Sequence, residues 1–226
     1  MNVIELTGVS KTHAGSPPVA ALHSVTLTVH PGEFAAITGP SGSGKSTLLA
    51  IAGTLERPSA GTVRLAGQPT DSLPDRELCA IRAAVIGFVF QQFHLVPWLT
   101  AVDNVATALL YRGMRASDRR RAAADALADV GLASRASHRP AELSGGECQR
   151  VAIARAMVGQ PAAILADEPT GSLDTAAGQG VLGMLANLNS RGTTVIVVTH
   201  DPDVAALAHR IIRLRDGRIV ADGSAA

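Results

Sequence analysis

The chain has 226 residues, which suits one α/β domain or one domain with a subdomain, and it is long enough to bury a core. Its 20 basic and 19 acidic residues leave a formal net charge of +1, so charge gives no support for binding to nucleic acid or anionic lipid. Two cysteines are too few for a disulfide framework, and no apolar run approaches the ~18 residues that cross a bilayer, so we expect a soluble protein of a reducing cytosol.

Short alternating or apolar segments predict the first strands. Residues 3–7, 24–29 and 62–65 alternate apolar and polar side chains, as half-buried antiparallel strands do. One glycine and two prolines within residues 12–18 predict a loop. Residues 34–38 form a further apolar segment, which we also expect to be a strand.

A glycine-rich turn follows residues 34–38 and precedes the apolar run 48–52. Glycines let several backbone N–H groups point at one anion, and the next helix directs the positive end of its dipole there. Lys45 would reach the β- and γ-phosphates of a nucleotide, and the Ser46 hydroxyl would ligate Mg²⁺. A flexible linker is the alternative, but a linker has no reason to place Lys-Ser-Thr before a helix. The order predicts a phosphate-binding loop of Gly39, Pro40, Ser41, Gly42, Ser43, Gly44, Lys45, Ser46 and Thr47.

The middle of the chain is predicted to be mainly helical, and the end to be strands. Residues 71–84 and 117–130 have helical spacing, with Ser117 where an N-cap is expected. Residues 163–166 and 194–198 are almost wholly apolar, which is typical of central parallel strands whose C-terminal ends line a nucleotide site. Residues 211–220 contain an Asp-Gly turn between two short apolar segments and predict a hairpin.

Two carboxylates follow the predicted strand 163–166. Asp167 at the strand end can hold the coordination sphere of Mg²⁺, usually through water. Glu168 is then placed to polarise a water for attack on the γ-phosphate, provided that its carboxylate faces the nucleotide. An exposed acidic pair is the alternative, and the phosphate-binding loop upstream makes the catalytic interpretation the better one.

A second glycine-rich helix start follows residue 143. Ser144, Gly145 and Gly146 precede an apolar helix over residues 151–156 and would form a second anion-binding helix terminus, although an ordinary cap is the default for such a segment alone. The order and spacing of several motifs agree with one family. Together with the phosphate-binding loop, this segment resembles the signature motif of the ATPase subunits of ABC transporters, as do Gln91 after residues 88–90 and the segments 167–170, 172–174 and 199–201.

The resemblance implies that two copies pair head to tail as a homodimer across two ATP molecules. Each ATP would lie between the phosphate-binding loop of one copy and Ser144 of the other. Gln91 would touch Mg²⁺ or the attacking water and report the γ-phosphate to the helical part. His200 would contact the γ-phosphate and hold the water and Glu168 in line, although a loop histidine beside an aspartate is the plain alternative. Asp174 would bridge to the opposing copy.

The resemblance also implies the domain organisation. We expect an α/β fold of the P-loop NTPase class with a mainly parallel sheet, an N-terminal antiparallel β subdomain and an inserted α-helical subdomain. In this single ABC ATPase domain, residues 1–90 and 160–226 would form the nucleotide-binding core with the antiparallel β subdomain. Residues 91–159 would form the helical subdomain, including the signature motif.

The implied partner is a membrane permease, in a complex of two ATPase and two permease subunits at the cytoplasmic face of the cell membrane. Residues 92–100 hold the only tryptophan, Trp98, after a proline in a predicted loop, which favours exposure at a partner surface. By resemblance, this region receives a coupling helix of the permease. No nucleic-acid partner is expected.

Two positions depart from the family pattern. His13 stands where the family usually offers an aromatic ring for stacking on adenine, so we expect weaker stacking, with a solvent-facing loop histidine as the alternative. The signature continues with Glu147 and Cys148, where Gln-Gln is commoner. We expect Cys148 to be a small buried helix residue, and a redox-sensitive thiol is the alternative.

Residues 88–97 and 169–174 look like the branch that contains lipoprotein-releasing, macrolide-exporting and haem-exporting systems. The resemblance implies an ATPase that powers an export permease for cargo of the lipoprotein, peptide, drug or haem class. A cell-division ATPase that uses the same machinery without moving a substrate is the alternative. A soluble ABC protein acting on DNA or ribosomes would usually need a second nucleotide-binding half, a coiled-coil insertion or zinc cysteines, which this sequence lacks.

Overall fold

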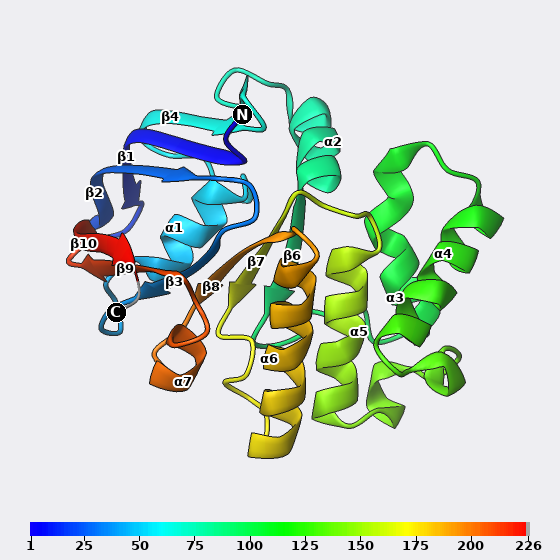
Figure 1. The fold of residues 1–226 in the computed structure, drawn as a ribbon. Helices are drawn as coiled ribbons and strands as arrows, with labels where there is room; N and C mark the ends of the chain where they lie inside the picture. The colour runs from blue at the N-terminus through cyan, green and yellow to red at the C-terminus, as the bar shows by residue number, and fades with distance from the viewer. Residues whose placement is uncertain (225–226) are drawn as a thin grey trace.

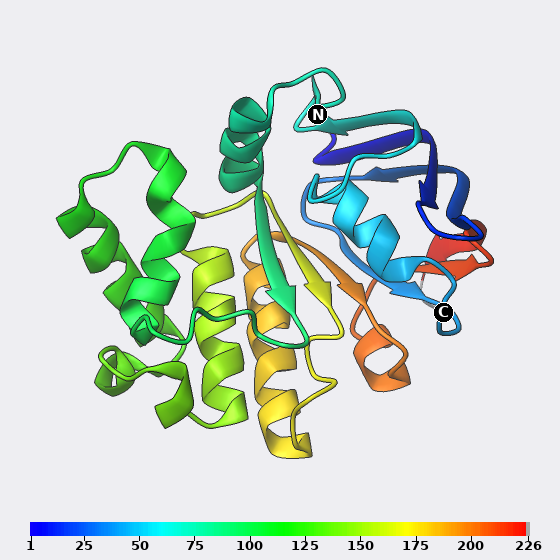
Figure 2. The ribbon, with the colours of Figure 1, turned by 180° about the vertical axis from the view of Figure 1, so that it is seen from behind.

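Two β-sheets and the helices around them make up the computed structural model, which describes residues 1–224 (Figures 1 and 2). One sheet has four strands in the order β2-β1-β4-β5, and the other has six in the order β10-β9-β3-β8-β7-β6. The four-stranded sheet lies at one side of the molecule, and helices α3, α4 and α5 lie at the other (Figure 1).

The smaller sheet is antiparallel, as the alternating side chains predict. Its strands are β1 (Ile4–His13), β2 (Val19–Val29), β4 (Ala60–Leu65) and the short β5 (Gln68–Pro69). Strands β1 and β2 are longer than expected, because Thr12 and His13 pair with Ala20 and Val19. The predicted loop over residues 12–18 therefore shrinks to residues 14–18.

The larger sheet is mainly parallel. Its strands are β3 (Phe34–Thr38), β6 (Ile86–Phe90), β7 (Ala163–Asp167), β8 (Thr194–Val198), β9 (Arg210–Arg215) and β10 (Arg218–Ser224). Strands β6, β7, β8 and β3 pair in parallel, so their carboxyl ends meet at one edge. The predicted hairpin is confirmed, with Asp216 and Gly217 at positive φ between β9 and the antiparallel β10. This edge is where the site must form.

Helices occupy both faces of the larger sheet and the region beyond β6. They are α1 (Lys45–Ala52), α2 (Asp75–Val85), α3 (Ala101–Ala106), α4 (Ala116–Asp129), α5 (Gly145–Met157), α6 (Thr175–Ser190) and α7 (Pro202–Ala205), with 3-10 turns η1 (Thr107–Arg112), η2 (Ala133–Arg135) and η3 (Pro140–Glu142). None of the helices in the described part is both long and apolar enough to span a bilayer.

Two helix starts differ from the prediction. Ser117 is not an N-cap, because α4 begins at Ala116 and its N-cap, Arg115, makes no side-chain capping bond. The helix expected from residue 71 begins only at Asp75, after Pro74. Asp71 instead accepts a hydrogen bond from the Val63 N–H at 3.1 Å, which ties this segment to β4.

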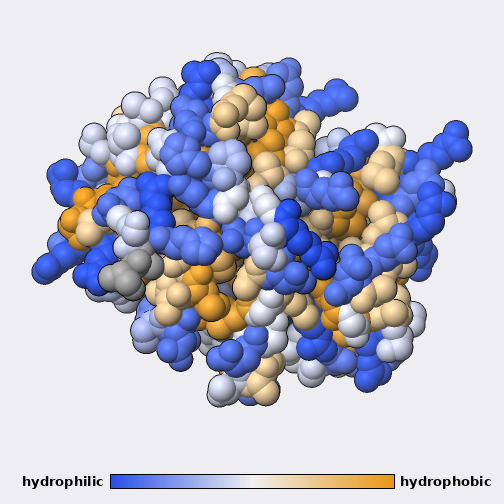
Figure 3. Space-filling view, viewed as in Figure 1, coloured by the Kyte–Doolittle hydropathy of each residue, from blue (hydrophilic) through white to orange (hydrophobic). Residues whose placement is uncertain are grey.

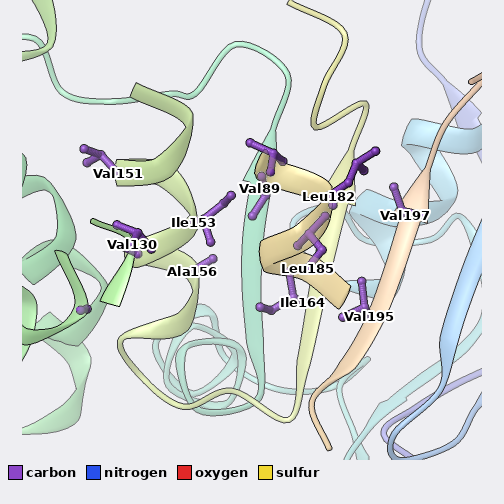
Figure 4. Close-up of a cluster of buried hydrophobic side chains, with 14 of the residues drawn as sticks. Val89, Val130, Val151, Ile153, Ala156, Ile164, Leu182, Leu185, Val195 and Val197 are labelled. Carbon is purple, nitrogen blue, oxygen red and sulfur yellow. The ribbon is translucent and has the colours of Figure 1, made fainter. Parts of the chain in front are cut away.

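Two hydrophobic clusters lie on opposite faces of the larger sheet, because alternate residues of each buried strand point to opposite sides. One cluster joins Ala36, Ile164 and Val197 to α5 and α6 (Figure 4). The other joins Ile37 and Leu165 to α1 and to the antiparallel sheet. The sheet therefore separates α1 from α5. The outer surface in the view of Figure 3 is mostly hydrophilic, with apolar side chains in separate patches.

Candidate functional site

The predicted phosphate-binding loop lies between β3 and α1, at the carboxyl edge of the larger sheet. Gly39 has a φ of 151°, and a Cβ there would lie 2.0 Å from the Leu214 carbonyl oxygen, so only glycine fits. The Lys45 ammonium donates to the carbonyl oxygens of Gly39 and Pro40 at 2.9 and 2.8 Å, across the loop. The Ser43 hydroxyl is buried without a hydrogen-bond partner among the described residues. A curled backbone, an ammonium group and a spare hydroxyl fit a polyphosphate.

Ser46 and Asp167 come from distant segments and meet at this edge. The Ser46 hydroxyl donates to Asp167 Oδ1 at 3.2 Å. Burial raises the pKa of Asp167 above its ordinary value, although the Ser46 bond and Lys45 oppose that shift. Hydroxyl and carboxylate oxygens are ligands that Mg²⁺ prefers, usually with phosphate oxygens and water completing the shell. Among residues 1–224, no group of three or more acidic, histidine or cysteine side chains is arranged to hold a metal ion. The Ser46 hydroxyl and the Asp167 carboxylate provide two oxygen ligands of the kind that fit Mg²⁺.

Glu168 and His200 form a close pair beside Asp167. His200 Nδ1 lies 2.8 Å from Glu168 Oε1, and this hydrogen bond raises the pKa of His200. Glu168 has a φ of 45°, which is uncommon for a side chain other than glycine. Its N–H donates to the Val198 carbonyl at 2.9 Å, which holds this strained residue between β7 and β8. Such strain commonly marks functional sites.

Gln91 directly follows β6, the edge neighbour of β7. Its carbonyl oxygen accepts a hydrogen bond from the Ser172 hydroxyl at 2.8 Å. The Gln91 amide nitrogen would lie 2.9 Å from a Cβ built on Gly171, so its side chain packs against the loop that follows Glu168. The structure thus gathers the phosphate-binding loop, Gln91, Asp167, Glu168 and His200 at one edge of the sheet.

His13 ends strand β1 beside the last residue of the phosphate-binding loop. Its Nε2 lies 3.4 Å from the Thr47 hydroxyl, and its Nδ1 lies 3.5 Å from a Glu56 carboxylate oxygen. The imidazole is partly exposed at the rim of the loop. This position is compatible with contact to a bound base.

Ser144 caps helix α5, as predicted. Its hydroxyl accepts from the Glu147 N–H at 3.2 Å, and Glu147 Oε2 accepts from the Ser144 N–H at 2.9 Å, which completes a capping box. The Ser144 bond lowers the pKa of Glu147. A Cβ on Gly146 would lie 2.9 Å from Ala177 Cβ, so this glycine lets the start of α5 pack close to α6.

The structure does not bring Ser144, Gly145 and Gly146 to the phosphate-binding loop of the same chain. Helix α5 packs on one face of the larger sheet and α1 on the other. The Asp174 carboxylate also binds within its own segment, because it caps α6 by accepting from the Ala177 N–H at 2.8 Å. The site at the sheet edge is therefore built without the second predicted anion-binding terminus.

Two residues of α5 were not predicted to shape the site. Arg155 donates to the carbonyl oxygens of Phe93 and His94, at 2.7 and 2.6 Å, and so holds the segment after Gln91. Gln149 donates to the Pro169 carbonyl at 2.6 Å. The available signal was a polar or charged residue within an apolar helix, but the sequence does not reveal which loop it would contact.

Cys148 is 6% exposed, and burial raises the pKa of its thiol. The expectation of a small buried helix residue is confirmed, and the redox-sensitive alternative loses support because a protonated thiol is a poor nucleophile. Trp98 is 74% exposed, as expected from its place after Pro97.

Comparisons with known proteins agree with this geometry. A family model described as ABC transporter matches residues 22–171. The chain is 49% identical over 219 residues to the uncharacterized ABC transporter ATP-binding protein YknY of Bacillus subtilis, covering 96% of the chain and 95% of that protein. It is 50% identical over 223 residues to the macrolide export ATP-binding/permease protein MacB of Chromobacterium violaceum, covering 98% of the chain but 35% of that protein. The dimeric post-hydrolysis structure of the ATP-binding cassette MJ0796 bound to ADP and Pi matches with a TM-score of 0.90 and 45% identity, over 98% of both chains.

Proposed function

The chain belongs to the ABC transporter family as an ATP-binding domain with ATPase activity, and on this basis we propose that it works as an ATP-driven homodimer that powers an export permease. The observation that most supports a dimer is the separation of Ser144 from the phosphate-binding loop by the larger sheet. A single copy then supplies half of each of two ATP sites. The similarity to a dimeric cassette gives the same arrangement independent support.

Within one half-site, the loop 39–47 would hold the ATP phosphates, with Lys45 leaving the Gly39 and Pro40 carbonyls for the β- and γ-phosphates. Ser46 and Asp167 would hold Mg²⁺, which when bound neutralises charge on the phosphates. His13, at the rim of the loop, would face the base.

Hydrolysis would use the pair at the strand ends. Water attacks the γ-phosphorus, the bond to the ADP oxygen breaks, and the Glu168 carboxylate takes the proton of the water. The 2.8 Å contact to His200 would keep that carboxylate oriented and place the imidazole toward the γ-phosphate. Gln91, which packs against the loop after Glu168, would sense whether the γ-phosphate is present.

The second half-site comes from the partner copy. The start of α5, with Ser144, Gly145 and Gly146, would present its N–H groups and the positive end of its dipole to the ATP held by the neighbouring loop. Asp174 would lie at the same interface. Because neither surface is complete alone, hydrolysis would require closure of the dimer.

A groove beside β6 suits the membrane partner. This cavity of about 360 Å³ lies between α2, β6, η1 and α5, and among the described residues that line it none is acidic. Its arginines, Arg82 and Arg155, donate to backbone carbonyls and take part in none of the described ion pairs. Phe88, Phe90 and Tyr111 add aromatic surface. We assign this groove, together with the exposed Trp98, to a permease segment that carries carboxylates.

The cargo belongs to the permease, and we propose lipoprotein, peptide, drug or haem class molecules. The chain spans about a third of the macrolide exporter that it resembles, where the ATP-binding and permease parts share one protein. We propose that two ATP-binding domains act with two permease subunits at the cytoplasmic face of the membrane.

Replacement of Glu168 tests this function. Glu168→Gln removes the proton acceptor but keeps the shape, so we expect ATP binding to persist and turnover to fall by at least ~10²-fold. ATP should then hold the variant as a dimer in sedimentation, while wild-type protein returns to monomers as it hydrolyses. A monomeric variant with normal turnover would contradict both the base and the dimer.

A further inference from the structure

Helix α5 is joined to the loop after β7 by one buried amide. Gln149 is 0% exposed, and its Nε2 donates to the Pro169 carbonyl oxygen at 2.6 Å. Its Oε1 is buried without a partner among the described residues. A buried, unpaired carbonyl oxygen lowers stability, and an apolar side chain of the same length would avoid that cost. The hydrogen bond from Nε2 to Pro169 is therefore the one interaction here that an apolar side chain could not make.

The two elements that Gln149 joins serve different nucleotides in the proposed dimer. Its helix begins at Ser144, which would contact the ATP of the partner copy. Its acceptor, Pro169, directly follows Glu168, which would act on the ATP of its own copy. The loop continues to Asp174, the cap of α6, and Gly146 packs against Ala177 in the first turn of that helix.

A displacement at the start of α5 would therefore be transmitted along the helix to Gln149 and, through its hydrogen bond to Pro169, to the neighbouring Glu168. Gln149 lies five positions after Ser144, within the helix that Ser144 caps. Glu168 has a strained backbone, which is held by its N–H bond to the Val198 carbonyl and by the bond from the Gly171 N–H to its own carbonyl at 3.1 Å. Pro169 lies between these two bonds, so a change at Pro169 acts directly on the backbone that positions the Glu168 carboxylate. The same helix also holds the segment after Gln91 through Arg155.

We propose that Gln149 is a positioning residue that aligns Glu168 for attack when the start of its helix engages the nucleotide of the neighbouring copy. The inference rests on the proposed dimer. Gln149 is assigned an effect on turnover and none on the affinity for ATP, because its one described hydrogen bond goes to Pro169 and not to the phosphate-binding loop or to Ser46 and Asp167.

Gln149→Met tests the assignment, because methionine has a similar length and shape but cannot donate to Pro169. We expect kcat for ATP hydrolysis to fall about three- to tenfold, which corresponds to one lost buried hydrogen bond. The KM for ATP should stay at the wild-type value. The midpoint of thermal unfolding should change little, because loss of the bond to Pro169 is offset by removal of the buried, unpaired Oε1.

Asn104→Leu is the matched control. Asn104 is also a fully buried amide, but it binds Val96, Leu99 and Thr100, away from Glu168. This variant should lower the unfolding midpoint and leave kcat unchanged at temperatures where it is folded. If Gln149→Met keeps wild-type kcat, or if both Gln149→Met and Gln149→Leu fail to fold, the amide has only a structural role and the proposal is wrong.

Sedimentation with ATP separates this inference from the function on which it rests. In the Glu168→Gln background, protein with and without Gln149→Met should form dimers at the same ATP concentration. Failure of Glu168→Gln itself to dimerise counts against the proposed dimer. Failure of only the double variant means that Gln149 acts on ATP-driven assembly and overturns its assignment to Glu168.

Discussion

Glu168 is the residue on which the proposed chemistry most depends, and its backbone conformation is unusual. Glu168 has a left-handed φ of 45° at the end of β7. The Val198 carbonyl accepts from its N–H, and the His200 imidazole contacts its carboxylate, so both stabilise this conformation. Such a conformation is maintained only where its surroundings determine it. The position of the Glu168 carboxylate therefore depends on β7 and on the segment after β8, which meet only in the folded chain.

The Glu147 carboxylate makes the stability of the α5 capping box depend on pH. The pKa of its carboxyl is lowered chiefly by the Ser144 N–H, with a smaller effect of Arg135 at 3.2 Å. A folded pKa below the ordinary value means that the stabilisation is complete above the ordinary value and is lost as the pH falls through the folded pKa. We expect Glu147→Gln, which keeps an acceptor, to reduce by about 1 °C the decrease in unfolding midpoint as the pH falls from 7 to about 3, because the stabilisation is lost only below the ordinary carboxyl pKa. Identical pH profiles for both proteins would show that this carboxylate adds nothing to the cap.

At the scale of elements, local chemistry was sufficient to predict one turn and the central strands. The Asp-Gly pair specified the β9–β10 turn, and the apolar runs specified β7 and β8. Ser117 shows where local chemistry fails, because α4 packs its alanines and Leu127 into the core from a start one residue earlier and without a side-chain cap. The strand extension through His13 was hidden because it depends on pairing with Val19 across the loop.

For the site, motif order predicted which residues gather, but not what holds them. Ser46 and Asp167 were expected together, and their hydroxyl and carboxylate are in contact. The hydrogen bonds from Gln149 and Arg155 to backbone carbonyls were not predictable, because every residue has a carbonyl and the sequence does not show which one a side chain will bind. The roles of the individual residues in catalysis stay predictions.

The phosphate-binding loop offers an element-level test of packing. At Gly39 an added Cβ meets the Leu214 carbonyl at 2.0 Å, whereas at Gly42 nothing lies within 4 Å although φ is 76°. Gly39→Ala should lower the free energy of unfolding in urea by about 2 to 4 kcal/mol, through both overlap and strain. Gly42→Ala should lose about 1 kcal/mol from strain alone. Equal losses would mean that the loop moves freely away from β9.

At the scale of the whole molecule, the proposed ATP site would be formed by two surfaces that lie on different faces of the larger sheet. The larger sheet separates α1 from α5, so the loop that would hold ATP and the helix start that would complete its site lie on opposite sides of one core. In the proposed dimer, a second copy in head-to-tail arrangement would supply what each copy lacks. The groove that we assign to the permease is lined in part by Arg155 of α5, so a shift of α5 would change the shape of this groove.

Chemical cross-linking between two introduced cysteines tests this claim most directly. Cys79 and Cys148 are first replaced by alanine in the Glu168→Gln background, and single cysteines are then placed at Ser41 in one preparation and at Ser144 in another. Mixed with ATP and a short bismaleimide, the two preparations should give a covalent dimer that contains one chain of each kind, and ADP should give far less. A stable ATP-bound dimer that yields no such product would contradict a site shared between the loop of one copy and Ser144 of the other.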